Sequence, residues 1–492
     1  MGLCAASQSS SGVPNGAAGD GVKHFDVVVL GFGVSAGYFA LELSKSAKAP
    51  KRVAFIGKEP VVAYERPALS KSYLFPPGSK PIAVQDIYAG VAQSSEPQGP
   101  EWYAARGWTT FLNSTVSAVD MNTRLCTVVK QGSSKALPVH YDQLVLALGQ
   151  VEKKIPVPEN DLDGVCYLRS EAEARDFIAR VEKITGRSKH MKGDIPPPRG
   201  RVVVLGAGYL GVEVLTAMAG WGFEEVSVVI LADIMLSKMA WPRVAREKMH
   251  RAILDRAPNI KVFGGCSVEM FTAQTGTRKL KAVVIDDGGN GIRMDSHVTL
   301  ETELCLVCVG SSVAPLLGEL ARANRLHSRR DDSVVTDDTL RTDHPSRRVW
   351  AIGESTVPEC GVVGARQMGA AAARSVLAAH TGTKEPPFGL HEFTTLEHHY
   401  SRFFEYTDSP IIWQSYGTFS VSPGVREAVG FGLANSFNKG FGYFWFDPRS
   451  RKVVSTFCAS DGKSKLFETV GKIATQGTDI DVAMRTVYEL VR

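Results

Sequence analysis

Two short glycine-rich segments have the residue types and the spacing needed to hold the pyrophosphate of a dinucleotide. The first reads GxGxxA and the second GxGxxG, and each lies between an apolar β-branched run and an apolar pattern at helical spacing. In such a turn the first glycine permits the bend, the second lets phosphates approach the backbone, and the small third residue lets helix and strand pack. The free N–H groups at the helix N-terminus then stabilise the phosphates. The residues concerned are Gly31, Gly33 and Ala36 in the first segment and Gly206, Gly208 and Gly211 in the second.

Acidic residues follow both segments at places where a carboxylate could accept a hydrogen bond from a ribose hydroxyl. Glu59 follows the second strand of the first unit, and Asp233 ends the matching strand of the second unit. Glu213 lies one turn into the second helix. An acid at the position of Asp233 favours NADH, because it would repel the 2′-phosphate of NADPH. Lys238 and Arg243 lie not far beyond, so NADPH remains the alternative.

The two phosphate-binding turns, 31–36 and 206–211, are called the first and second cradle below. Two of them in one chain predict hydride passage from a nicotinamide to a flavin, because each cofactor needs its own phosphate site. We therefore expect FAD in the first unit and NADH in the second. A disulfide reductase would also carry two cysteines a few residues apart beside the flavin, and no such pair lies between Gly31 and Gly149. The electrons must then pass to an outside acceptor. Cys305 and Cys308 form a CxxC, but their apolar segment is typical of a buried strand, and we interpret them as core residues.

The elements that position these residues predict an α/β fold with two Rossmann-like FAD/NAD(P)-binding domains plus a smaller C-terminal α+β domain. The polar, proline-rich segment 186–200 is typical of a linker into the second unit, and the strand-like segment 347–355 indicates a return to the first domain. Aromatic-rich segments after residue 390 alternate like antiparallel strands. The expected divisions are a tail (1–23), an FAD-binding domain (24–155 and 310–385), an NAD(P)H-binding domain (156–309) and the C-terminal domain (390–492).

Composition excludes several classes of function. The chain has 492 residues, and its net charge of +5 arises from 56 basic and 51 acidic residues without a long run of either sign. Nucleic-acid binding therefore has no electrostatic support. No segment approaches the ~20 consecutive apolar residues that a membrane span requires. The sequence predicts a small-molecule substrate, no nucleic-acid partner and no metal site, and it leaves the oligomeric state open.

Residues 1–23 are rich in Ser, Gly and Ala and contain no arginine, which favours a disordered tail over a transit peptide. Gly2 and Cys4 are candidate acylation sites that would give a weak lipid anchor, although Ala6 stands where the acylation pattern has Ser or Thr. We expect a cytoplasmic protein, with a plastid location or peripheral attachment to a membrane as alternatives.

Several further segments give the chain a more specific resemblance. They read YERPALSKSYLFPP (64–77), PEWY (100–103), YSRFFEY (400–406), WQSYG (413–417) and FGYFW (441–445). In this order they resemble the monodehydroascorbate reductases, in particular their plastid and mitochondrial branch. The resemblance implies an enzyme that takes two electrons from NAD(P)H onto FAD and passes them singly to two monodehydroascorbate radicals, which regenerates ascorbate.

The resemblance also implies roles for individual residues. Arg66 and Lys71 match FAD contacts, and a guanidinium suits phosphate recognition. Tyr400 matches the aromatic residue beside the radical site, and Arg402 is a candidate charge partner for an anionic substrate; both could instead fix the small domain onto the others. The glycines Gly149, Gly310 and Gly353 are expected to line the cofactors.

The chain departs from the family pattern in several places, one of which is Leu148 in place of the threonine of the family's ATG. Glu354 stands where the family has an aspartate beside Gly353, and the segment 362–374 is small and apolar apart from Arg366, Gln367 and Arg374. The family's substrate arginine falls at about Gly369. His398 and His399 precede Tyr400 in place of aromatic residues and could supply positive charge when protonated. A diverged non-catalytic relative, or a ferredoxin- or quinone-type reductase, are therefore the alternatives.

Overall fold

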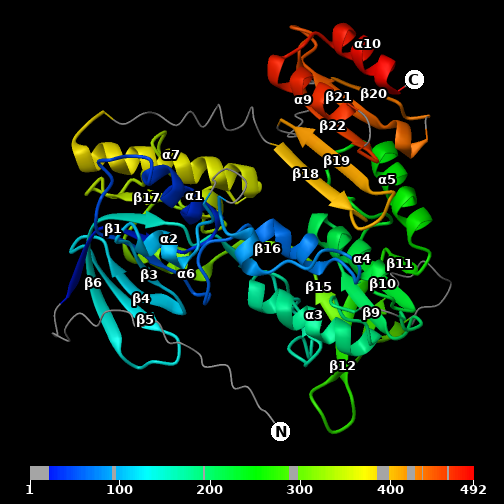
Figure 1. Cartoon of the computed structure of the whole chain (residues 1–492), viewed down its shortest axis with the longest axis horizontal. Coiled ribbons are helices and arrows are strands. Elements are labelled where there is room, and N and C mark those ends of the chain that lie inside the picture. The colour runs from blue at the N-terminus through cyan, green and yellow to red at the C-terminus, as the bar shows by residue number, and fades with distance from the viewer. Residues whose placement is uncertain are drawn as a thin grey trace, which may run out of the picture.

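The computed structural model describes residues 22–90, 96–191, 194–286, 297–358, 360–384, 398–417, 427–434, 436–462 and 465–491. Figure 1 shows three parts: a sheet flanked by helices, a second sheet with its own helices, and a small C-terminal sheet covered by two helices. Gly2, Cys4 and most of the expected tail lie outside the described residues. Lys23, which we assigned to the tail, instead begins a strand, because it pairs with Val139.

The first part is built on a seven-stranded sheet with the order β3-β2-β1-β6-β5-β4, in which β17 also pairs with β6. Strands β1, β2, β3, β6 and β17 are parallel where they pair, and β4 and β5 form an antiparallel extension. The strands are β1 (Lys23–Leu30), β2 (Val53–Ile56), β3 (Thr109–Phe111), β4 (Ser114–Asp120), β5 (Leu125–Lys130), β6 (Ala136–Leu146) and β17 (Val349–Ala351). The helices are α1 (Val34–Leu43), α2 (Pro100–Ala104), α6 (Pro315–Ala323) and α7 (Gly361–Thr381), with 3-10 turns at Arg66–Ser70, Ser72–Leu74, Val84–Ile87 and Gly353–Ser355.

Burial on both faces explains the apolar run of β1. Val27 and Val29 pack into one cluster with α1 and α7, whereas Val28 and Leu30 pack into a second cluster with α6. A strand covered on both faces reads as a continuous apolar run rather than an alternation. The PEWY segment forms most of α2, where Trp102 and Tyr103 pack edge to face behind the first glycine turn.

The second part contains a five-stranded parallel sheet with the order β11-β10-β9-β15-β8, next to a three-stranded antiparallel sheet β12-β13-β14. Its strands are β8 (Val165–Cys166), β9 (Arg201–Leu205), β10 (Glu225–Ile230), β11 (Ile260–Gly264), β12 (Ser267–Ala273), β13 (Leu280–Asp286), β14 (His297–Glu301) and β15 (Cys305–Val307). Its helices are α3 (Glu171–Thr185), α4 (Tyr209–Gly220) and α5 (Arg243–Arg256). The chain enters and leaves this part through a two-stranded ribbon of β7 (Gln150–Glu152) and β16 (Ser311–Val313).

The third part is an antiparallel sheet with the order β18-β19-β22-β21-β20, covered by α9 and α10. Its elements are β18 (His398–Phe403), β19 (Ile411–Tyr416), β20 (Glu427–Phe431), β21 (Phe441–Phe446), β22 (Val453–Ser460), α9 (Leu466–Gln476) and α10 (Ile480–Val491), with a 3-10 turn at Phe437–Lys439. Together the three parts confirm the predicted fold class. In the part of the chain that the structure describes, no helix is long and apolar enough to cross a membrane.

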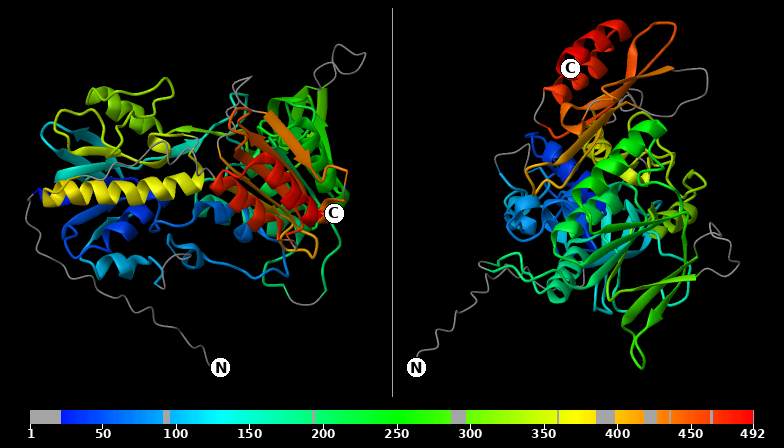
Figure 2. Two further views of the ribbon diagram at one scale, coloured as in Figure 1. Left: turned by 90° about the horizontal axis from the view of Figure 1, so that it is seen from above. Right: turned by 90° about the vertical axis from the view of Figure 1, so that its right-hand side faces the viewer.

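Helices α1 and α7 lie side by side along the first sheet, and one end of α7 reaches the C-terminal sheet (Figure 2). The small residues of α7 permit this close packing. A Cβ atom added at Gly369 would lie 2.2 Å from the carbonyl oxygen of Ser35 and 3.0 Å from the backbone nitrogen of Phe39. The resemblance placed the family's substrate arginine at about this position, where in this chain no side chain fits between the two helices.

We predict that Gly369→Ala lowers the thermal midpoint of unfolding. A glycine-to-alanine change inside a helix usually stabilises by about 0.5–1 kcal/mol, but here the overlap with α1 should cost about 1–3 kcal/mol. Ala370→Ser is the matched control, because it adds one atom to the neighbouring, half-exposed position. An unchanged or higher midpoint for Gly369→Ala would contradict the packing described here.

Candidate functional site

The first glycine turn joins β1 to α1 and has the geometry of a phosphate cradle. Gly31 has φ +98°, and a Cβ atom there would lie 2.1 Å from the carbonyl oxygen of Ala147, so only glycine fits. A Cβ atom added at Gly33 would have a single neighbour within 4 Å, Nη2 of Arg66 at 3.6 Å. Ala36 is fully buried. The backbone at Gly33 is therefore open on the side that Arg66 faces.

Arg66 and Glu59 lie together beside this turn. Nη2 of Arg66 is 3.0 Å from Oε1 of Glu59, whose other oxygen accepts a hydrogen bond of 2.6 Å from Tyr64. Burial disfavours the charge of Arg66, but the interactions with Tyr64 and Glu59 outweigh burial and raise its pKa. A permanently charged guanidinium next to an open glycine suits a pyrophosphate. Glu59, expected to bind ribose, is here the partner of Arg66 and Tyr64.

A second charged pair lies next to the ends of β6 and β17. Nη2 of Arg169 is 2.7 Å from Oε2 of Glu354, and the Arg169 carbonyl accepts a hydrogen bond from Arg66. Both side chains approach Gly149, whose N–H donates to Oγ of Ser355. Gly353 has φ +64° and lies against Ser35. The extra methylene of Glu354 is thus used to reach Arg169, a residue that sequence reasoning missed because no local pattern marks it.

The second glycine turn joins β9 to α4 and repeats the design of the first. Gly206 has φ +91° with the carbonyl oxygen of Cys308 2.6 Å from its Cβ position, and at Gly211 the carbonyl oxygen of Gly206 is 2.0 Å away. Apart from the adjoining backbone, no atom of the described residues lies within 4 Å of the Cβ position of Gly208 or of Gly310. Gly208 therefore has the open backbone that a second pyrophosphate would need.

Asp233, the acidic residue of the second unit that we expected to bind a ribose hydroxyl, is paired with an arginine. Oδ2 of Asp233 lies 2.5 Å from Nη2 of Arg243, and both side chains are exposed. The hydrogen bond from Arg243 lowers the pKa of Asp233, so the carboxylate is charged at neutral pH. A ribose hydroxyl could bind the carboxylate and a 2′-phosphate could bind the guanidinium. The pair therefore supports NADH and NADPH alike, although the sequence favoured NADH.

Helices α1 and α4 both begin at a glycine, with no side-chain cap and no acidic residue in the first turn. By contrast, α3 begins with a complete capping box of Ser170 and Glu173. The first N–H groups of a helix need partners, which side chains, water or an anionic ligand supply. The residues present at both turns therefore fit a dinucleotide phosphate.

Glu213 lies where the three parts of the chain meet. Its side chain is 7% exposed, and Oε1 is 2.8 Å from Nζ of Lys71. The hydroxyl of Ser70 donates to one carboxylate oxygen, and the hydroxyl of Ser401 donates to the other. Glu213 and Lys71, which we expected to contact different cofactors, are thus bound to each other, and they bring the two cradles to one junction.

Strand β18 presents alternate residues to different surroundings. His399 stacks on Tyr209, with ring centroids 6.3 Å apart, and Ser401 binds Glu213. Burial lowers the pKa of His399, so this histidine is neutral and does not supply the positive charge that we considered.

Tyr400 is 42% exposed, and Nη1 of Arg402 is 2.8 Å from Oε1 of Glu405. The charge of Arg402 is therefore already paired within its own segment. Tyr209, the residue after Gly208, was not predicted.

Arg366 of α7 is the guanidinium that the structure brings near Tyr400. Its Nη2 is 2.6 Å from Oε2 of Glu65, and Oε1 of Glu65 accepts a hydrogen bond of 2.8 Å from Tyr38. Burial opposes the charge of Arg366, but Glu65 outweighs it and raises the pKa, with a smaller contribution from Tyr400. About a quarter of the Arg366 side chain is exposed. Arg366 precedes Gly369 by three residues on the same helix.

All described cysteines are free, and Cys305 and Cys308 are both buried. Burial raises the pKa of Cys308 to about 12, so it is a thiol at neutral pH. Both cysteines are therefore core residues, as the apolar segment around them predicted.

We predict that Gly33→Val abolishes retention of FAD while the chain still folds. The fold has room for the side chain, but that side chain would occupy the approach of the pyrophosphate. Flavin absorbance and the thermal midpoint of the purified variant measure the two effects. Gly208→Val is the reciprocal control: it should keep FAD and raise the KM for NADH at least tenfold. A yellow Gly33→Val variant would contradict the assignment of the first cradle.

Comparison with known proteins agrees with this geometry. The family model described as pyridine nucleotide-disulphide oxidoreductase matches residues 25–375. The chloroplastic/mitochondrial monodehydroascorbate reductase of Arabidopsis thaliana is 26% identical over 471 residues, which cover 93% of this chain and 83% of the relative. A monodehydroascorbate reductase of Solanum lycopersicum is 28% identical over 471 residues, with 92% and 94% covered.

The fold is also similar to that of solved structures. The covalent complex of putidaredoxin reductase with putidaredoxin superposes with a TM-score of 0.71 at 19% identity, covering 95% of this chain and 98% of that chain. A water-forming NADH oxidase from Lactobacillus brevis gives 0.69 at 16% identity, with 92% and 91% covered. At these identities the likeness concerns the fold alone. The cofactor prediction and the family resemblance are confirmed: the chain belongs to the pyridine nucleotide-disulphide oxidoreductases, whose members use FAD and NAD(P)H, and is a divergent homologue of the monodehydroascorbate reductases.

Proposed function

We propose that this chain reduces the monodehydroascorbate radical to ascorbate with electrons from NADH or NADPH. Family membership makes it a flavin-dependent NAD(P)H oxidoreductase, so the proposal concerns the electron acceptor. The family model ends at residue 375, whereas the similarity to monodehydroascorbate reductases covers more than nine-tenths of the chain. The C-terminal sheet is therefore part of that similarity. This supports an acceptor site to which β18 contributes.

The observation that carries the proposal is the contact between α7, which holds the paired Arg366, and β18, which holds the exposed Tyr400. The radical is a small planar anion with neighbouring oxygen atoms. A guanidinium suits such oxygens because its N–H groups form a fixed fork, and an aromatic ring suits a flat molecule. Glu65 and Tyr38 hold Arg366 in place from the other side. Arg366 would orient the anion, and Tyr400 would cover it.

The reaction balances as one NAD(P)H, two radical anions and one proton giving NAD(P)⁺ and two ascorbate anions. FAD, when bound, supplies the change from a two-electron donor to a one-electron acceptor. Arg66 and the turn at Gly33 would hold its pyrophosphate, and the turn at Gly208 would hold that of the nicotinamide. The pair of Lys71 and Glu213 would keep both cradles at one junction. No side chain needs to transfer a proton to carbon, so the residues mainly bind and orient.

We predict that Arg366→Gln lowers kcat/KM for the monodehydroascorbate radical about tenfold to a hundredfold, since a hydrogen bond to a charged group contributes about 1.5–3 kcal/mol. The effect should fall mainly on KM. Ferricyanide reduction by NADH, which needs no shaped acceptor site, should change less than twofold. Both rates are measured on the same FAD-loaded sample, with the radical generated enzymatically from ascorbate.

Arg374→Gln is the matched control, because Arg374 lies on the same helix and is also paired, to Glu42 at 2.9 Å. The double variant Glu65→Gln/Arg366→Gln tests whether an unpaired buried carboxylate causes the loss. Equal effects of Arg366→Gln and Arg374→Gln on the radical would contradict this site. A wild-type protein that reduces a ferredoxin or a quinone but not the radical would overturn the proposed acceptor, and one that binds no FAD would favour a non-catalytic role.

A further inference from the structure

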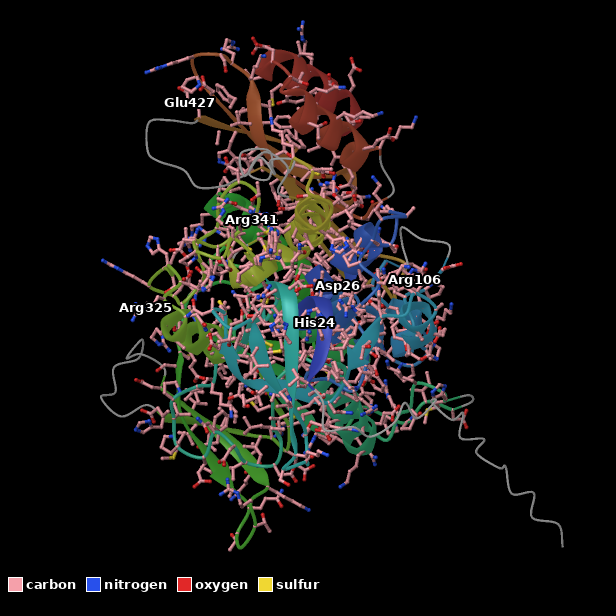
Figure 3. All side chains as sticks on the ribbon, turned by 90° about the vertical axis from the view of Figure 1, so that its left-hand side faces the viewer. His24, Asp26, Arg106, Arg325, Arg341 and Glu427 are labelled. Carbon is pink, nitrogen blue, oxygen red and sulfur yellow. The ribbon has the colours of Figure 1, made fainter. Side chains whose placement is uncertain are left out.

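A cluster of two histidines and one aspartate lies at the end of the first sheet that is remote from both cradles. His24 is on β1, and His140 and Asp142 are on the neighbouring strand β6. His24 precedes Gly31 by seven residues, which along a strand is about 23 Å. Figure 3 shows His24 where β1 lies beside β6. None of these residues takes part in the proposed function.

The pairing of the two strands places all three side chains on one face. His24 is the register partner of His140 in a parallel pair, and Asp142 follows His140 by two residues. Because side chains alternate along a strand, His140 and Asp142 point to the same side as His24. Phe25 and Tyr141, which lie between them, point into the core beneath. The three polar side chains are thus fixed by a rigid, hydrogen-bonded backbone.

The distances suit a shared ion. Nε2 of His24 is 3.2 Å from Oδ1 of Asp142, the ring centroids of His24 and His140 are 5.1 Å apart, and one ligand atom from each residue lies within 4.8 Å of the others. A tetrahedral zinc ion with bonds of about 2.0–2.1 Å holds its ligand atoms about 3.3–3.4 Å apart. His24 and Asp142 already have this separation. The nitrogen of His140 would have to approach the other two ligand atoms to complete the set.

From this geometry we infer that His24, His140 and Asp142 form a binding site for a divalent transition-metal ion, with zinc as the best match. Two imidazole nitrogens and one carboxylate oxygen are ligands that zinc takes, and water would fill the fourth position. A contact between His24 and Asp142 would by itself account for those two residues. It does not account for His140, whose side chain has no hydrogen-bond or ion-pair partner within the described residues.

One neighbouring charge opposes a cation at this site. Nη1 of Arg124 lies 3.7 Å from Oδ1 of Asp142, and its side chain is 37% exposed. Arg124 stands in the turn between β4 and β5 with φ +59°, so its side chain can turn toward solvent without moving the sheet. An ion would displace Arg124 from Asp142. The site would then connect β1 to β6 and stabilise the native sheet by binding to it alone.

The test uses full-length, FAD-loaded protein without an affinity tag, stripped with a chelator and then titrated with Zn²⁺ against a chromophoric competitor. We expect one equivalent to bind in the micromolar range or tighter and to raise the thermal midpoint. His24→Ala and His140→Ala should each weaken binding at least tenfold, with the flavin spectrum and ferricyanide reduction unchanged. Arg124→Gly, which suits the positive φ and removes the opposing charge, should tighten binding.

His297→Ala is the matched control, because Nδ1 of His297 is 2.7 Å from Oε2 of Glu269 without a second imidazole beside it. It should leave the zinc titration unchanged. Titration with Co²⁺ adds a direct readout, since four-coordinate cobalt absorbs strongly in the visible range. The site is refuted if His140→Ala binds Zn²⁺ as tightly as the wild type, or if binding needs millimolar ion. Loss of binding in His297→Ala equal to that in His140→Ala would refute it as well.

Discussion

The arrangement of the redox site depends on one buried carboxylate, Glu213. An ionised carboxylate placed away from water costs several kcal/mol unless charge and hydrogen bonds replace the water. Here the replacement comes from Lys71 and Ser70 in the first part of the chain and from Ser401 in the third, while Glu213 itself belongs to the second. The carboxylate is therefore fully satisfied only when all three parts are assembled. This requirement brings the two phosphate cradles to a common junction.

The same junction explains why β18 serves two purposes. Ser401 must point at Glu213, so His399 on the same side of the strand packs on Tyr209, and the next residue along, Tyr400, is left 42% exposed. Alternation along the strand thus separates residues that join the domains from a residue that can meet a substrate. Helix α7, which carries Arg366, contacts β18, and its close approach to α1 at Gly369 fixes the position of the helix.

Local constraints made the two cradles predictable from sequence, and long-range contacts made the rest of the site unpredictable. Gly31 and Gly206 both have positive φ and a backbone carbonyl against the Cβ position. Only glycine is tolerated at such positions, so both turns can be recognised in the sequence. The contact between Arg169 and Glu354 joins residues 185 apart, and that between Ser70 and Glu213 joins residues 143 apart, with no local pattern for either. Arg366 was noted in the sequence without a role, and Gly369, one of the small residues near it, packs closely against α1.

The departures from the family pattern do not argue for a protein that has lost its cofactors. Glu354 is longer than the expected aspartate, and its length is used in an ion pair with Arg169 beside Gly149. The cradles themselves keep the features that a dinucleotide needs. Gly33 and Gly208 have open space where a side chain would fit, and the helices that begin there carry no cap. A capping side chain at either position would stabilise the helix by only about a few tenths of a kcal/mol relative to glycine. Glycine at both positions, with the charged Arg66 beside Gly33, suits phosphate binding.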